Sequence, residues 1–119
     1  MKQEPVFFAV AMAAAGAAQA EQPWTHVGSV GQRQFVLVDP DAASDAATLK
    51  RAAEAVCEPG KACVVVFWSE AAAVPSQMPM TRPQQQAAVA QYFRNPASGS
   101  EELLMRCPAN APLGSKCLR

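Results

Sequence analysis

The sequence has no excess of charge of either sign. Its 119 residues include 10 Lys and Arg against 10 Asp and Glu, and charged residues make up only 17% of the chain. This balance excludes a basic protein that coats nucleic acid and an acidic disordered tail. Because 50% of the residues are apolar, the chain can fold around a core, and its length predicts one domain.

The sequence also lacks the motifs that most directly indicate catalysis or metal binding. The six glycines are scattered and form no phosphate-binding loop. The single histidine, His26, has no recognisable catalytic partner, and Ser69 is outside any G-x-S-x-G turn. The cysteine spacings, C-x5-C and C-x9-C, differ from the C-x2-C of zinc knuckles and thiol oxidoreductases. We therefore expect neither a cofactor nor a bound metal.

An uncharged run from Val6 to Ala18 lies close to the first residue. It is shorter than the roughly 20 residues that a membrane-spanning helix needs, and Ala18-Gln19-Ala20 has the small-x-small form that signal peptidase recognises. The sequence thus predicts a signal peptide over 1–20 and one exported globular domain over 21–119. We expect a periplasmic or secreted protein with no stable membrane insertion after cleavage.

The predicted domain contains four cysteines, Cys57, Cys63, Cys107 and Cys117. An even number in a small exported chain indicates two disulfides. We favour Cys57–Cys63 and Cys107–Cys117, because Pro and Gly between the members of each pair allow the chain to turn. Each short loop would contribute about 2–3 kcal/mol and a long-range pair about 4 kcal/mol, so chain entropy leaves the pairing open.

Hydrophobic periodicity and turn residues divide the domain into six elements. The apolar run 62–68 is typical of a central strand that is covered on both faces. Ser44 or Asp45 can cap a first helix, and Thr81 with Gln84 forms the capping box of a second. In chain order we expect strands over 24–30 and 34–39, a helix over 44–57, a strand over 62–68, a helix over 81–93 and a strand over 102–107.

This order, β-β-α-β-α-β, predicts an α+β or small α/β two-layer sandwich with two disulfides. The direction of the last strand stays open. A turn signal over 95–99 and a tail rich in Pro and Gly flank that strand.

Five residues are candidates for contact with a partner. Trp24 and Trp68 could line a binding surface, since tryptophan is favoured at interfaces. Glu70 follows the central strand directly and is the acid of most interest. Met78 and Met80 lie in a Pro-rich loop, where they either contact a partner or fill gaps in the packing.

These observations predict a small non-enzymatic domain that binds another envelope or extracellular protein, as an inhibitor or accessory factor, and that does not bind nucleic acid. One alternative is a small periplasmic hydrolase that uses Asp39 or Glu70 at a strand end. Another is a copper-handling protein, in which Met78 and Met80 bind Cu(I) with His26 or Met105. A third is a structural subunit of an envelope complex.

Overall fold

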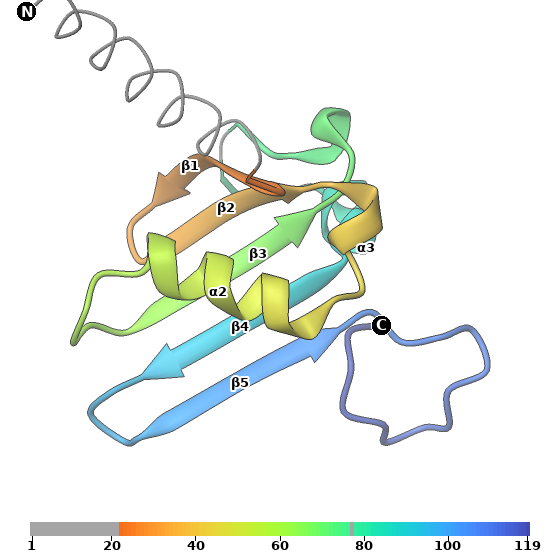
Figure 1. Ribbon diagram of the computed structural model, residues 1–119. Coiled ribbons are helices and arrows are strands. Elements are labelled where there is room, and N and C mark those ends of the chain that lie inside the picture. The colour runs from red at the N-terminus through yellow and green to blue at the C-terminus, as the bar shows by residue number, and fades with distance from the viewer. Residues whose placement is uncertain (1–21, 77) are drawn as a thin grey trace, which may run out of the picture.

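A computed structural model describes residues 22–76 and 78–119 (Figure 1). The predicted signal peptide, 1–20, lies outside these residues. The strands form one five-stranded sheet in the order β1-β2-β3-β4-β5, in which β2 and β3 are parallel and the other neighbours are antiparallel. The elements are β1 (Trp24–Val30), β2 (Arg33–Val38), η1 (Pro40–Ala42), α2 (Ala46–Val56), β3 (Cys63–Trp68), η2 (Ala71–Ala73), α3 (Arg82–Ala87), β4 (Ala90–Asn95) and β5 (Ser100–Met105).

The first two strands, expected from the sequence over 24–30 and 34–39, pair as an antiparallel hairpin. Val30 pairs with Arg33 across a two-residue turn, and Gly31 adopts a φ of 60°, which glycine accepts without steric cost. The register shifts between His26 and Gly28, so β1 contains a bulge along the outer edge of the sheet.

Helix α2 connects the two parallel strands and packs across one face of the sheet (Figure 1). Of the two expected caps, Asp45 is the one used: its carboxylate accepts hydrogen bonds from the Ala47 amide at 3.2 Å and the Thr48 hydroxyl at 2.7 Å. The bond from Thr48 lowers the pKa of Asp45. Leu49 and Ala53 are fully buried and pack the helix against the sheet.

Strand β3 is central, as the apolar run predicts. Val65 and Phe67 pack beneath α2, whereas Val66 and Trp68 belong to a second cluster on the opposite face. All four side chains are buried, and β3 has hydrogen-bonded neighbours along both edges.

The predicted helix over 81–93 is wrong beyond Ala87. The capping box forms, but α3 ends at Ala87, and the chain continues as β4 from Ala90. Alternate residues of β4, Ala90 and Tyr92, are buried, which is the period of a strand. The strand forms because it satisfies the free edge of β3, and the Val89 amide already donates to the Phe67 carbonyl at 2.8 Å.

The element order is therefore β-β-α-β-α-β-β, with one strand more than predicted. The turn over 95–99 is confirmed, and it joins β4 to β5 as an antiparallel hairpin. Strand β5 begins at Ser100 rather than at Glu102 and runs antiparallel to β4, which settles its direction.

Both favoured disulfide pairings are confirmed. Cys57–Cys63 joins the end of α2 to the start of β3, and both cysteines are buried in the core. Cys107–Cys117 closes a loop after β5, which Figure 1 shows beyond the end of that strand.

Replacing both core cysteines, Cys57→Ala with Cys63→Ala, should lower the free energy of unfolding by about 2 kcal/mol, because the unfolded chain gains the entropy of an open loop. Urea denaturation followed by tryptophan fluorescence measures the change. The wild-type protein without reductant is the control, and an unchanged midpoint would contradict the expected role of this bond.

Tyr92 provides a pH-dependent contribution to stability that can be observed directly, because it is the only tyrosine in the chain. Burial, and the hydrogen bond that its hydroxyl donates to Glu101 at 2.6 Å, raise the pKa of Tyr92 to about 12. The unfolded phenol titrates near pH 10. The contribution of protonated Tyr92 to the free energy of unfolding should therefore be complete below about pH 10 and lost between about pH 10 and 12.

Ultraviolet absorbance of the phenolate measures this titration in the folded protein. Tyr92→Phe should remove this part of the alkaline loss of stability. A Tyr92 titration at its ordinary pKa in the folded protein would contradict the prediction.

Candidate functional site

The face of the sheet opposite α2 is only partly covered. Residues 71–76 and 78–88, with η2 and α3, pack on it through the buried cluster of Phe35, Val66, Trp68 and Ala88. This segment leaves the sheet after β3 and returns beside it at β4, so it covers only that end. The rest of this face stays exposed or half-buried.

We call this uncovered part the open face. Register places one row of residues across all five strands: Val30 pairs with Arg33, Arg33 with Val64, Val64 with Phe93, and Phe93 with Glu102. Paired residues lie on the same side of a sheet. Within the row, Val30 is 45% exposed and Phe93 is 40% exposed. The open face comprises Val30, Arg33, Val64, Gln91, Phe93, Glu102 and Leu104.

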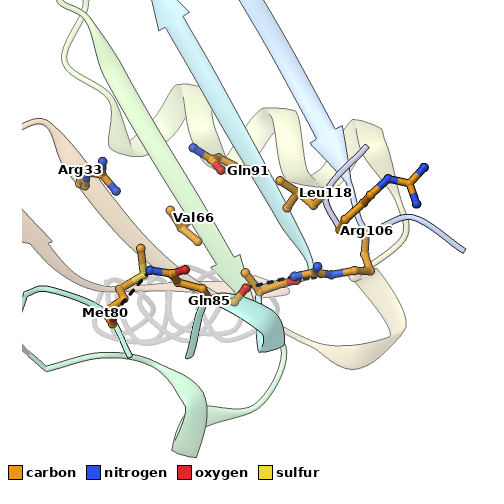
Figure 2. Close-up of a pocket in the computed structure, with 9 residues that line it drawn as sticks. Arg33, Val66, Met80, Gln85, Gln91, Arg106 and Leu118 are labelled. Carbon is orange, nitrogen blue, oxygen red and sulfur yellow. Dashed lines mark hydrogen bonds between the residues drawn. The ribbon is translucent and has the colours of Figure 1, made fainter. Parts of the chain in front are cut away.

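A pocket of about 280 Å³ lies where the open face meets α3 and the last residues of the chain (Figure 2). Three arginines line it, and its described lining contains no Asp or Glu. Val66, from β3, lies at the floor of the pocket, and Gln91 projects from β4 beside Val66 (Figure 2). The full lining is Arg33, Val66, Met80, Gln85, Ala88, Gln91, Arg106, Leu118 and Arg119.

Arg106 is held in place by the C-terminal end of α3. Its Nε donates to the Ala88 carbonyl at 2.9 Å, and its Nη2 donates to the Gln85 carbonyl at 3.2 Å and also to Ala88. Carbonyls at the end of a helix have no partner within the helix, and a cation there is favourable. Within the described residues, Nη1 of Arg106 makes no hydrogen bond.

The chain after β5 builds another wall of the pocket. The Cys107 amide donates to the Leu118 carbonyl at 2.7 Å, and the Leu118 amide donates to the Met105 carbonyl at 2.8 Å. Together with the Cys107–Cys117 disulfide, these bonds keep Leu118 beside Arg106. The second disulfide therefore positions part of the pocket.

Arg33 lies on the opposite side of the pocket from Arg106 (Figure 2). It begins β2, and its side chain is exposed. Among the described residues, no Asp or Glu side chain forms an ion pair with Arg33, Arg106 or Arg119. Glu102, the acid of the open face, pairs instead with Lys116 at 3.0 Å. The arginine side chains of the pocket thus have no Asp or Glu partner among the described residues.

A second hollow of about 210 Å³ lies beside the Cys57–Cys63 loop and the β1–β2 turn. Its lining includes Glu58 and Lys61, which form an ion pair at 3.1 Å. Opposite charges therefore pair within this hollow. In contrast, the charged side chains in the described lining of the arginine-lined pocket are all positive.

The two tryptophans do not share a surface. Trp24 is half-buried against the cluster under α2. Trp68 is fully buried on the other face, where its Nε1 donates to the Gln84 carbonyl at 2.9 Å. Its ring packs edge to face against the ring of Phe35, with the ring centroids 5.6 Å apart. Trp68 therefore holds α3 on the sheet, and its ring is not exposed to a partner.

The other predicted contact residues, Glu70, Met78 and Met80, are likewise divided between the packed interior and the exposed surface. Met78 and Met80 pack against the cluster under α3, as gap-filling side chains do, and Met80 also lines the pocket. Glu70 is exposed ahead of η2 and lines neither hollow. Of the predicted set, only Met80 lies at the pocket.

The ligands expected for copper are separated by the sheet. Met78 and Met80 lie on the side of α3, whereas Met105 packs in the cluster under α2. His26 lies on β1, where its Nε2 contacts the Gln34 side-chain oxygen at 2.8 Å. Across the part of the chain that the structure describes, His, Cys, Asp and Glu form no group of three that could hold a metal ion.

The carboxylates of the hydrolase alternative follow neighbouring parallel strands. Asp39 comes directly after β2 and Glu70 two residues after β3, so both lie toward one edge of the sheet. Both are exposed, and neither lines the arginine-lined pocket.

Sequence reasoning missed Arg33, Phe93 and Arg106. Phe93 lies in the stretch 81–93 that the sequence predicts as a helix, and the run from Ala90 to Phe93 has no clean apolar–polar alternation that would indicate a strand. The two arginines have no local motif, since sheet pairing and the second disulfide bring them together.

Within residues 22–76 and 78–119, no helix is both long and apolar enough to cross a membrane. No protein-family model, no curated protein and no solved structure matches this chain.

Arg106→Lys should lower the free energy of unfolding by about 1–2 kcal/mol, because lysine cannot reproduce the forked contact with the Gln85 and Ala88 carbonyls. Arg82→Lys is the matched control: Arg82 is exposed on α3 and lines neither hollow. Urea denaturation measures both variants, and equal midpoints would show that Arg106 does not anchor α3.

Proposed function

We propose that this protein is a small exported domain that is not an enzyme and binds another protein of the cell envelope or extracellular space through its open face. The observation that carries the proposal is the row across the sheet, with Val30 and Phe93 both more than a third exposed beside a pocket lined by arginines. Exposed apolar surface with a polar border is typical of interaction sites.

The dimensions of the open face favour a protein partner. Strands in a sheet lie about 4.8 Å apart, so a row across five strands extends roughly 20 Å. A small ligand would occupy only the pocket, whereas a segment of another protein can contact the pocket and Phe93 together. Phe93 would provide the apolar anchor, since aromatic side chains contribute strongly to interfaces.

The charge of the pocket favours an acidic partner. Arg33, Arg106 and Arg119 line it without an ion-pair partner among the described residues. Complementary charges speed association and select between partners. We therefore expect the partner surface to carry Asp or Glu where it meets this pocket.

Export is supported by the two disulfides together with the signal-peptide pattern. Both bonds close short loops, and such bonds persist in oxidising compartments. The hydrolase and copper-handling alternatives have less support, because the pocket lacks Asp39 and Glu70 and the proposed sulfur ligands lie on opposite faces.

Phe93→Ser should weaken binding of the partner about tenfold or more, because it removes the central apolar contact. Leu113→Ser is the matched control: Leu113 is 93% exposed and outside the open face. A photo-reactive benzoyl-phenylalanine at position 93, and separately at 113, first identifies in the native host the protein that contacts the open face. Titration of the purified partner against wild type and both variants then measures affinity.

A partner that crosslinks at position 93 only, and that loses affinity with Phe93→Ser but not with Leu113→Ser, is the expected result. Equal affinities for wild type and Phe93→Ser, or crosslinking of the same protein at both positions, would contradict the proposal.

A further inference from the structure

The pocket has hydrogen-bond donors that are already oriented. Three hydrogen bonds to the end of α3 fix the Arg106 guanidinium, and the N–H groups of its Nη1 have no partner among the described residues. A group held in place before binding loses little conformational freedom when a ligand arrives. Gln91 lies between Arg106 and Arg33 in Figure 2 and adds a side-chain amide.

The floor of the same pocket is apolar. Val66 and Ala88 are buried beneath it, and Leu118 and Met80 form apolar parts of its walls. A volume of about 280 Å³ is just below the range of about 300–1,000 Å³ for small-molecule pockets, and it suits one or two amino-acid side chains. The lining thus combines a cationic border with a surface that an aliphatic side chain can cover.

We propose that this pocket recognises a carboxylate side chain, Asp or Glu, that lies next to an aliphatic residue in the partner segment. Resting on the proposed function, the inference names the chemistry by which the partner is selected. The carboxylate lies between Arg33 and Arg106, and the aliphatic side chain covers Val66 and Leu118. The guanidinium of Arg33 can bind this carboxylate with two parallel hydrogen bonds, whereas Arg106 offers only the N–H groups of its Nη1, because its Nε and Nη2 already donate to α3.

The test uses acetyl-Leu-Glu-amide as the probe, because it carries one carboxylate beside one aliphatic side chain. Acetyl-Leu-Gln-amide is the matched probe without the charge. Titration of the full-length, disulfide-bonded, 15N-labelled protein at low salt follows the Nε–H signals of Arg33 and Arg106 and the side-chain amides of Gln85 and Gln91. We expect these signals to shift with the acidic probe and its affinity to exceed that of the amide probe about fivefold.

Arg33→Gln should remove most of this preference, because the Arg33 side chain is exposed and forms no ion pair with the described residues, so its replacement leaves the sheet pairing of β2 in place. Arg82→Gln removes the same charge from an exposed position outside the pocket and should leave the preference intact. Arg106 is unsuitable for this purpose, since its replacement also disturbs α3.

Equal affinity for the two probes, or an equal effect of Arg33→Gln and Arg82→Gln, would overturn the inference. Inorganic phosphate is the third probe: tighter binding of phosphate at the same arginines would indicate a general anion site and would also overturn it. The result is separable from the proposed function, because that proposal fails when the partner is insensitive to Phe93→Ser, whichever probe the pocket prefers.

Discussion

Strand β3 is buried on both faces and hydrogen-bonded along both edges, and the other elements are placed by the need to satisfy it. Val65 and Phe67 require one cover, and Val66 and Trp68 require another. The first cover is α2, which connects parallel β2 and β3 and must therefore cross a face of the sheet. The second is the segment that leads to β4, held by the bond from Trp68 to Gln84.

The two covers differ in extent, and the open face is the result. Helix α2 extends over Ala46–Val56, whereas α3 has only 6 residues and belongs to a segment that leaves and returns at the same end of the sheet. The part of this sheet face that α3 does not cover stays exposed, and Phe93 lies there in the row of residues that crosses the sheet. At the boundary, Arg106 closes the end of α3 and lines the pocket, so one side chain both stabilises the fold and shapes the proposed site.

Residues that looked like contact residues in the sequence turn out to support the site from within. Tryptophan is common at interfaces, but Trp68 fills the space under α3. Its large ring, packed beside Phe35, buries more apolar area there than it would on the surface. Phe93 was concealed by a different error. The stretch 81–93 is rich in Ala and Gln, which favour helices, yet the unpaired edge of β3 outweighs that local preference.

The sequence by itself determined the central strand, a helix cap at Ser44 or Asp45 and the capping box at Thr81, and it favoured the two short disulfide loops, because each depends on residues that are close along the chain. It also indicated the balanced charge and the export pattern. Only the tertiary structure decided that 90–95 is a strand, that Trp68 lies inside, and that Arg33 and Arg106 border one pocket. These outcomes depend on sheet pairing between distant segments, and the energy of such pairing belongs to no single stretch of sequence.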